Sequence, residues 1–250
     1  MEKKTIEELI NWIKNYVESA HAKGVVLGMS GGKDSLVVAK LCALALGEQN
    51  VFGVIMPNGE MADKNDAEIT CKLLNIPHTT ININEYYSNL MEKVENVLVA
   101  QNITLSDVST INTPPRLRMT TLYALAGSLN YLVANTSNLS EISVGYSTKW
   151  GDSVGDFAPL ADFTKTEVCE IGLMLDLPEY LVNKLPSDGL SGKSDEAKMG
   201  LTYKNLDSFI RTGEQNEDYT QIMKLHNSTK HKRKSIAKFI YTKDNYFNKE

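Results

Sequence analysis

A serine- and glycine-rich run at residues 28–35 is the segment of the sequence best suited to chemistry. It reads Gly-Met-Ser-Gly-Gly-Lys-Asp-Ser and lies between an apolar stretch, residues 25–27, and a predicted helix that begins at residue 35. Glycines let backbone amides approach an anion, and the amino end of the helix adds positive potential. Ser30 and Ser35 supply hydroxyl donors, and Lys33 supplies a compact cation. The run predicts a phosphate-binding loop; a turn without a ligand is the alternative.

This run does not match two common nucleotide-binding motifs. The loop of the nucleotide hydrolases needs Ser or Thr directly after its lysine, whereas Asp34 follows Lys33 here and Leu27 stands at the first glycine position. The dinucleotide fingerprint G-x-G-x-x-G is not matched either. The S-G-G-x-D-S pattern resembles the pyrophosphate loop of the N-type ATP pyrophosphatases, which cleave ATP between its α- and β-phosphates and activate an oxygen as an adenylate. A carboxylate is also favoured electrostatically at a helix amino end, which gives Asp34 a purely structural alternative.

Further polar blocks accompany the loop at residues 115–127, 134–141, 145–152, 156–165 and 231–233. Together they resemble the NAD synthetase family, in its ammonia-dependent form, over nearly the whole chain. The resemblance implies a ligase that amidates deamido-NAD with ammonia, consumes ATP and yields NAD, AMP and pyrophosphate through an acyl adenylate. It also implies Mg²⁺, held by Asp34 and Glu141, which would come together at one edge of the sheet if they follow different strands.

The resemblance assigns the remaining roles residue by residue. The ATP-binding residues are expected to be Gly28, Met29, Ser30, Gly31, Gly32, Lys33, Asp34, Ser35, Thr136, Lys165 and Ser187. The deamido-NAD-binding residues are expected to be Arg116, Tyr123, Lys149, Asp156, His231 and Lys232. Tyr123 resembles the tyrosine that stacks on the nicotinate ring, which suits an aromatic face.

The residues expected to take part in catalysis are Asp152 and Lys165. We predict that Asp152 captures ammonium and accepts its proton, because the reactive species is neutral ammonia. An aspartate that merely caps a turn is the alternative reading of Asp152.

The elements that must position these residues alternate between short apolar strands and longer helices. Strands are expected at residues 25–27, 51–56, 78–83 and 131–134, and helices at 5–22, 35–46, 62–75, 85–100, 113–130, 204–211 and 219–230. This order predicts a single α/β domain, residues 1–250, with an open parallel sheet flanked by helices, Rossmann-like and similar to the adenine nucleotide alpha hydrolases. Residues 188–198 are expected to form a mobile loop, and residues 226–240 a flap over the substrate.

Composition narrows the class of protein. The 250 residues carry 26 basic and 31 acidic side chains, for a net charge of −5, and the pI is about 5.5. This mild acidity argues against a nucleic-acid-binding role. Three scattered cysteines provide no disulfide framework, and no apolar stretch suits a signal peptide or a membrane span. We therefore expect a cytoplasmic protein without nucleic-acid or membrane partners.

Two alternative functions and the oligomeric state remain open. Another N-type ATP pyrophosphatase, such as a tRNA-modifying enzyme or an amidotransferase synthetase subunit, would share the loop, and so would an inactive nucleotide-binding module. The length leaves no room for a glutamine amidase domain, so ammonia would arrive free or from a separate protein. The family also implies a homodimer with dinucleotide sites at the subunit boundary, for which Leu117, Met119, Leu122 and Leu125 are candidate contacts.

Overall fold

A four-stranded parallel sheet lies at the centre of the computed structural model, which describes residues 1–61, 63–184, 194–239 and 241. Its strands run in the order β3-β2-β1-β4. Their bounds are β1 (Gly24–Gly28), β2 (Val51–Ile55), β3 (His78–Thr80) and β4 (Tyr131–Val133). The α/β class and the parallel sheet are thereby confirmed. All four strands end at one edge, because parallel strands joined by right-handed crossovers share their direction.

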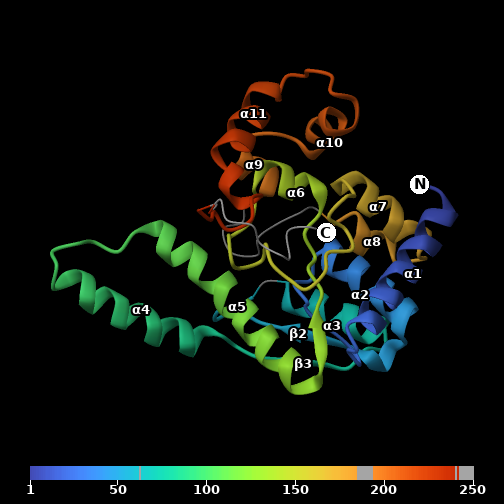
Figure 1. The fold of residues 1–250 in the computed structure, drawn as a ribbon, viewed down its shortest axis with the longest axis horizontal. Helices are drawn as coiled ribbons and strands as arrows, with labels where there is room; N and C mark the ends of the chain where they lie inside the picture. The colour runs from blue at the N-terminus through green and yellow to red at the C-terminus, as the bar shows by residue number, and fades with distance from the viewer. Residues whose placement is uncertain (62, 185–193, 240, 242–250) are drawn as a thin grey trace.

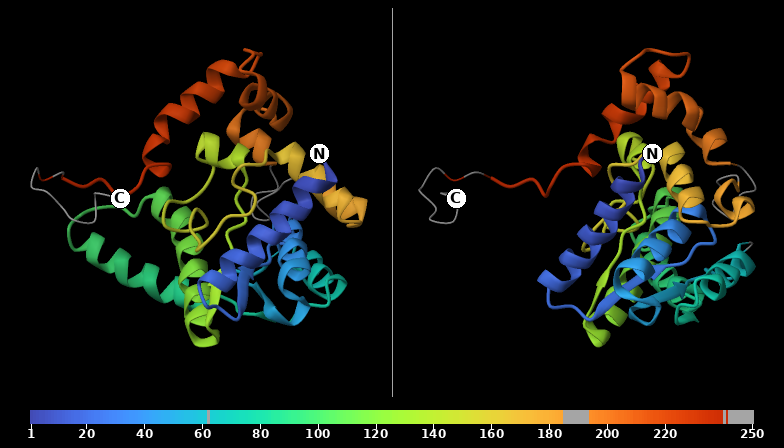
Figure 2. Two further views of the ribbon diagram at one scale, coloured as in Figure 1. Left: turned by 45° about the vertical axis from the view of Figure 1, so that its right-hand side comes forward. Right: turned by 90° about the vertical axis from the view of Figure 1, so that its right-hand side faces the viewer.

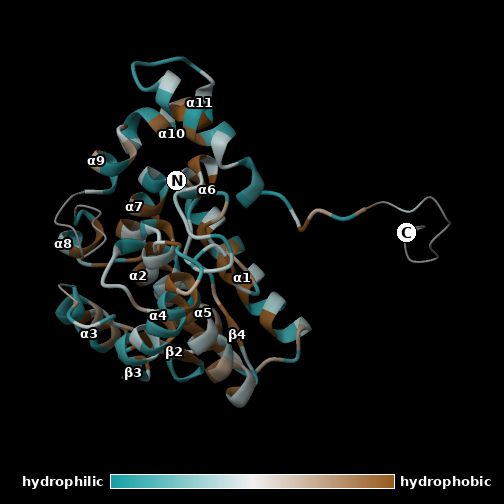
Figure 3. Ribbon diagram, turned by 90° about the vertical axis from the view of Figure 1, so that its left-hand side faces the viewer, coloured by the Kyte–Doolittle hydropathy of each residue, from teal (hydrophilic) through white to brown (hydrophobic). Residues whose placement is uncertain are grey.

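Helices cover both faces of the sheet (Figure 1). Helices α1 (Lys3–Ser19), α2 (Lys33–Leu46), α3 (Lys64–Leu73) and α7 (Lys165–Met174) lie on one side, and α5 (Asp107–Leu129) packs on β1 and β4 from the other. Side chains alternate along β1, so that Val25 and Leu27 enter the first core and Val26 enters the second. Figure 3 shows β4 as a hydrophobic ribbon between these layers. A short 3-10 helix, η1 (Glu48–Asn50), precedes β2.

Helix α5 begins earlier than its prolines suggest. We expected the helix to open at residue 113, but it starts at Asp107, and Pro114 and Pro115 lie inside it. The Ser106 hydroxyl accepts the Ser109 N–H at 3.3 Å and so caps the extra turns. A proline removes a donor and disfavours a helix interior, but the cap and the packing on α4 (Asn84–Val99) maintain the helix here.

Helices α4 and α5 lie side by side and project from the sheet as an arm (Figure 1). Apolar side chains remain exposed at its outer end: Val97, Val99, Ile103, Val108 and Ile111. The four leucine and methionine candidates for a dimer contact are not among them. Leu122 is buried against the sheet, and Leu117, Met119 and Leu125 pack around the same core. This part of α5 faces its own strands, and a dimer contact through these residues stays a prediction.

A second group of helices covers the strand ends. It comprises α6 (Leu139–Val144), α9 (Asp195–Met199), α10 (Tyr203–Thr212) and α11 (Tyr219–Ser228), while α8 (Glu179–Val182) follows α7. Their apolar side chains form a third cluster, separate from the two sheet cores. Residues 188–193 of the expected loop lie outside the described residues. The expectation was wrong for residues 195–198, because Ser194 caps α9 by accepting the Ala197 N–H.

The chain leaves this helical group after η2 (Lys230–Lys232) and runs away from the body (Figure 2). Of the expected flap, residues 226–232 pack on the turn after α6, whereas Ile236 and Phe239 are exposed. Residues 240 and 242–250 lie outside the described residues. Among the described residues, no helix is both long and apolar enough to cross a bilayer.

Candidate active site

A cavity of about 400 Å³ opens at the carboxyl edge of the sheet. All eight residues of the predicted phosphate loop, 28–35, line it. Thr136, Glu141, Asp152 and Lys165 line the same cavity from the segments that follow β4. In open α/β sheets this edge is where ligands bind, because several strands and helix amino ends converge there. The structure therefore brings the predicted ATP, metal and ammonia residues that it describes into one space.

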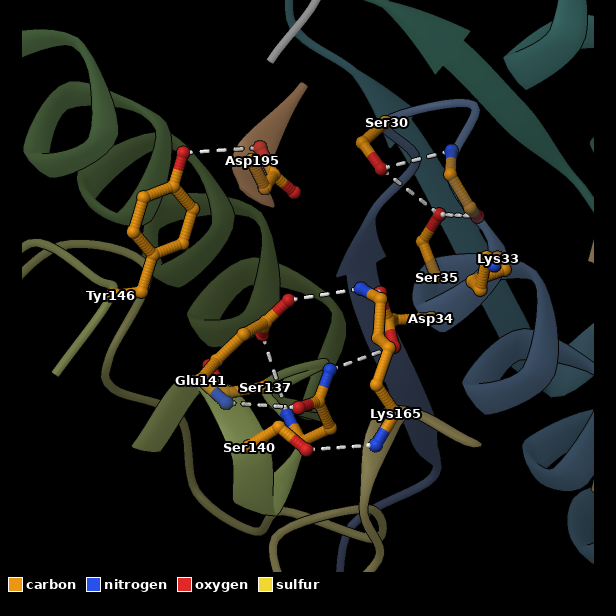
Figure 4. A network of polar contacts seen from close by, with 12 residues as sticks. Ser30, Lys33, Asp34, Ser35, Ser137, Ser140, Glu141, Tyr146, Lys165 and Asp195 are labelled. Atoms are coloured by element: carbon orange, nitrogen blue, oxygen red, sulfur yellow. Dashed lines mark hydrogen bonds and ion pairs between the residues drawn. The ribbon is translucent and has the colours of Figure 1, made fainter. Parts of the chain in front are cut away.

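The phosphate loop is held by its own serines (Figure 4). The Ser30 hydroxyl accepts the Gly32 N–H at 3.2 Å, and the Ser35 hydroxyl donates to the Gly32 carbonyl at 2.9 Å. The two hydroxyls lie 3.2 Å apart. These bonds fix a tight turn at the start of α2, whose first amides have no intrahelical acceptors and are available to an anion.

Lys33 adds a positive charge to this loop. Its side chain is buried, and its Nζ lies 3.5 Å from Cys169 Sγ on α7. A thiol is a weak acceptor, so it compensates the buried ammonium far less than a carboxylate or phosphate would. Lys33 therefore suits an anion that enters the cavity.

Gly31 gives a test of the loop that is independent of its charges. Its φ is +78°, and a Cβ there would lie 2.5 Å from the Asp63 carbonyl oxygen. We expect Gly31→Ala to cost about 2 kcal/mol or more in unfolding free energy and to raise the ATP dissociation constant at least tenfold. Urea unfolding and titration calorimetry measure both. Gly127→Ala on α5 is the matched control, since among the described residues no atom beyond its own stretch of helix lies within 4 Å of that Cβ. Unchanged nucleotide binding in Gly31→Ala would contradict the expectation.

Three charged side chains meet at the floor of the cavity. Lys165 Nζ donates to Asp34 Oδ2 at 2.6 Å and to Glu141 Oε1 at 3.0 Å. The Asn138 side chain caps α6 by accepting the Glu141 N–H and donates to Asp34 Oδ1 at 3.0 Å, which ties the two acids together. The expectation that Asp34 and Glu141 approach each other from different strands is confirmed, and Lys165 lies between them.

Burial determines the ionisation of this group. Burial raises the pKa of Glu141 to about 7, and the neighbouring Asp34 charge adds to this shift while Lys165 opposes it. Burial alone would lower the pKa of Lys165, but the two carboxylates raise it well above its ordinary value. The lysine therefore stays charged, and the cavity holds one ammonium between two acids.

The two acids form a suitable but incomplete set of ligands for Mg²⁺. Carboxylate oxygens are the ligands that this ion prefers, and it commonly completes its shell with waters and substrate phosphates. Among the described residues, no three His, Cys, Asp or Glu side chains group as a metal site would require. A divalent ion bound by Asp34 and Glu141 would thus depend on a nucleotide for its remaining ligands.

Asp152 combines both roles considered for it. Its Oδ1 accepts the Thr148 N–H at 2.6 Å, which is a turn-capping contact. The side chain also lines the cavity and is accessible there. Desolvation by the surrounding protein raises the pKa of Asp152, while the positive charges of Lys232 and Arg118 oppose this shift. The turn contact engages Oδ1, so Asp152 keeps its second carboxylate oxygen for a ligand.

The residues expected to bind the dinucleotide do not line this cavity. Hydrogen bonds join them in two groups, the first around Lys149. Lys149 Nζ donates to the His231 carbonyl at 2.9 Å, and Arg116 Nε donates to the Lys149 carbonyl at 3.3 Å. Lys232 Nζ donates to the Gly145 and Ser147 carbonyls and borders a second cavity of about 310 Å³.

The other dinucleotide group consists of Tyr123 and Asp156. The Tyr123 hydroxyl donates to Asp156 Oδ1 at 3.3 Å, and Asp156 Oδ2 accepts the Val133 N–H. Burial and this carboxylate raise the pKa of Tyr123 to about 12, so the phenol remains a neutral donor. The remaining predicted residue, Ser187, lies outside the described residues.

Polar residues that the sequence had not singled out as site residues also line the cavity, among them Arg118, Tyr146, Lys184 and Asp195. Arg118 Nε donates to the Met56 carbonyl at 2.9 Å, and the Tyr146 hydroxyl donates to Asp195 Oδ1 at 3.0 Å (Figure 4). Lys184 pairs with Asp63 and Asp66. Arg118 stands two residues after Arg116, and residues two apart on a helix point to different faces. Helix geometry could therefore have predicted that the two arginines serve different sites.

Comparison with known proteins extends this picture to the whole chain. A family model described as NAD synthase matches residues 5–249. An NH(3)-dependent NAD(+) synthetase of Carboxydothermus hydrogenoformans is 41% identical over 238 residues, covering 93% of this chain and 95% of that protein. A protein of the same name from Thermococcus sibiricus is 44% identical over 212 residues, covering 83% and 79%.

Solved structures agree with the sequence matches. A structure of NMN synthetase from Francisella tularensis has a TM-score of 0.87 and 35% identity, covering 96% of this chain and 98% of that chain. An NH3-dependent NAD synthetase from Campylobacter jejuni, solved with a nitrate ion, has a TM-score of 0.77 and 28% identity, covering 96% and 100%. With its phosphate loop and facing carboxylates at the strand ends, the chain belongs to the NAD synthase family.

Proposed function

We propose that this chain is a ligase that amidates deamido-NAD with ammonia at the expense of ATP, giving NAD, AMP and pyrophosphate. The observation that supports it most is the placement of the S-G-G-x-D-S loop opposite Glu141 and Lys165 in one cavity. That cavity pairs an anion cradle with charges suited to a transferring phosphate. The relatives named above give the substrate class.

The proposed reaction has two steps. A nicotinate carboxylate oxygen attacks the α-phosphorus of ATP, the bond to the bridging α–β oxygen breaks, and pyrophosphate leaves with the electron pair. Ammonia then attacks the acyl carbon, and AMP leaves with the carboxylate oxygen. Residues 28–35 hold the departing phosphates through backbone amides, with Lys33 as counter-charge, and Lys165 stabilises negative charge as it builds up. Asp152 accepts a proton from ammonium and so delivers the neutral ammonia that attacks.

Mg²⁺ is the proposed metal, with Asp34 and Glu141 as its protein ligands. When bound, it neutralises phosphate charge and stabilises the departing pyrophosphate. We further assign Thr136 and Ser187 to ATP, and Arg116, Tyr123, Lys149, Asp156, His231 and Lys232 to the dinucleotide. The segment 226–240 is proposed as a cover for the dinucleotide. The reaction is assigned to the cytoplasm, where the three free thiols stay reduced.

One incubation tests the proposed function. Deamido-NAD labelled with ¹⁸O in its carboxylate, ATP, MgCl₂ and ammonium should yield NAD and pyrophosphate, with one ¹⁸O atom in AMP. Label in AMP is the signature of the acyl adenylate. A parallel reaction with nicotinate mononucleotide is required because one similar structure is named an NMN synthetase. A higher kcat/KM for the mononucleotide would identify it, rather than deamido-NAD, as the substrate. The absence of pyrophosphate release with both substrates would overturn the proposal.

The proposal includes a homodimer, formed through the apolar tip of the arm rather than through the leucines on the sheet side of α5. Val108 and Ile111 at the start of α5 are 67% and 68% exposed, and Val97 and Val99 at the end of α4 are exposed as well. Exposed apolar side chains favour a partner, and a second copy carries the same residues. We expect sedimentation to give a dimer and the double variant Val108→Glu, Ile111→Glu to give a folded monomer. A monomeric wild type at micromolar concentration would contradict this.

A further inference from the structure

We propose that Asp207 is a positioning residue, which holds Glu141 and Lys165 in their working arrangement from a third helix. The inference rests on the proposed function, in which these two side chains act on ATP. Asp207 belongs to α10 and is 6% exposed, and it does not line the cavity. It therefore acts through its neighbours.

The Asp207 carboxylate joins the first turns of two other helices. The Ser140 hydroxyl on α6 donates to Asp207 Oδ1. The Thr166 N–H and hydroxyl on α7 donate to Asp207 Oδ2 at 2.8 and 2.6 Å. The Ser140 oxygen in turn accepts the Lys165 N–H at 2.9 Å. Each of these partners is the immediate neighbour of a cavity residue, Ser140 of Glu141 and Thr166 of Lys165.

This network also satisfies donors that a helix cannot satisfy itself. The first backbone N–H groups of a helix have no intrahelical acceptor. In α7 those of Lys165 and Thr166 are bonded to Ser140 Oγ and to Asp207 Oδ2. The position of Lys165 along and around the helix axis is thus determined by bonds that pass through one carboxylate.

A second side chain of α10 supports the same arrangement. Tyr203 lies four residues before Asp207, and so on the same face of the helix. The Lys165 Nζ lies over its ring, 5.2 Å from the centroid. Helix α10 therefore acts on Lys165 in two ways: indirectly on its backbone N–H, through Asp207 and Ser140, and directly on its ammonium, through Tyr203.

The test substitutes the carboxylate with its isostere. Asp207→Asn retains the volume but cannot accept from Ser140 and Thr166 together as two carboxylate oxygens do. Because a displacement of about 1 Å can cost about 10²-fold in rate, we expect kcat for pyrophosphate release to fall about 10²-fold. The KM for ATP should change less than threefold, since the phosphate loop is untouched. The rates are measured well below the melting temperature of each variant, so that a loss of stability does not enter.

A second readout is independent of activity. The Lys165 and Thr166 amides should exchange hydrogen for deuterium at least fivefold faster in Asp207→Asn, because their acceptors depend on this residue. Thr166→Val, which removes one hydroxyl and keeps the N–H bond, should give an intermediate loss of kcat.

Arg211→Gln is the matched control. Arg211 joins α10 to the same helix through an exposed ion pair with Glu167 at 2.6 Å, and its hydrogen bonds go to Glu167 and the Asp162 carbonyl rather than to Asp207, Ser140 or Thr166. We expect this variant to stay within threefold of wild type in kcat and in amide exchange. Equal losses in Asp207→Asn and Arg211→Gln, or unchanged exchange in Asp207→Asn, would overturn the inference. An inactive wild type would refute the proposed function instead, and amide exchange would still decide the role of Asp207.

Discussion

Replacing Lys165 with methionine is expected to lower the rate of pyrophosphate release about 10³-fold, at the upper end of losses seen when one electrostatic stabiliser is removed. Lys165 Nζ is the cation that contacts both Asp34 and Glu141, and methionine keeps the apolar length of its stem. Without that charge the departing phosphates lose a stabilising partner. Steady-state release of pyrophosphate, with ATP and deamido-NAD saturating, measures the effect.

The same variant should bind a divalent cation more tightly in the absence of ATP. Two carboxylates that lose their shared ammonium repel each other and need another positive charge. We therefore expect MgCl₂ to raise the melting temperature of Lys165→Met more than that of wild type. Lys184→Met is the matched control, a cavity lysine paired with Asp63 and Asp66 instead. If both lysine variants lose activity equally, general positive charge in the cavity matters and the specific place of Lys165 does not.

Replacing Asp152 with asparagine is expected to separate the two chemical steps. Asparagine can still accept the Thr148 N–H, so the turn persists, but it cannot take a proton from ammonium. We expect adenylate formation, followed as a burst of pyrophosphate, to stay within threefold of wild type. Formation of NAD should fall about 10²- to 10⁴-fold, the usual contribution of a positioned base.

The rate of amide formation should depend on pH in the direction set by the protonation of Asp152. The surrounding protein raises the pKa of Asp152, so its basic form disappears as the pH falls through that raised value. Wild-type amide formation should decline on the acidic side, whereas Asp152→Asn should lack this titration and recover in part at high pH, where ammonia is uncharged. Ser153→Ala removes the other side-chain contact to Thr148 in this turn and serves as the control. Equal losses of both steps in Asp152→Asn would show that the turn, and not a base, is required.

The sequence alone predicted the phosphate loop and the approach of Asp34 to Glu141. The phosphate loop could be identified because its glycines, serines and lysine are contiguous between a strand and a helix. Asp34 and Glu141 could be brought together because parallel strands end at one edge, and this requires no knowledge of side-chain packing. The assignment of Lys165 to ATP and catalysis came from the family resemblance, and only the structure places it between the two acids.

Tertiary contacts explain the errors and the omissions. Two prolines concealed the true start of α5, because the cap at Ser106 and the packing on α4 outweigh the local preference. Arg118 and Asp207 form hydrogen bonds with residues far away in the sequence. Arg118 donates to the Met56 carbonyl, and Asp207 accepts from residues 41 and 67 positions away. Such partners are chosen by the folded arrangement of helices, which periodicity alone does not encode.

The separate apolar cluster under α6, α9, α10 and α11 has a consequence for how the molecule comes apart. Its buried members, such as Leu206 and Ile222, share no core with the sheet. Regions joined mainly by polar bonds can open as independent cooperative units while the rest stays native. We therefore expect the C-terminal helices to open as a subglobal unit, and a nucleotide bound against α6 and the sheet together would couple this opening to that of the whole protein.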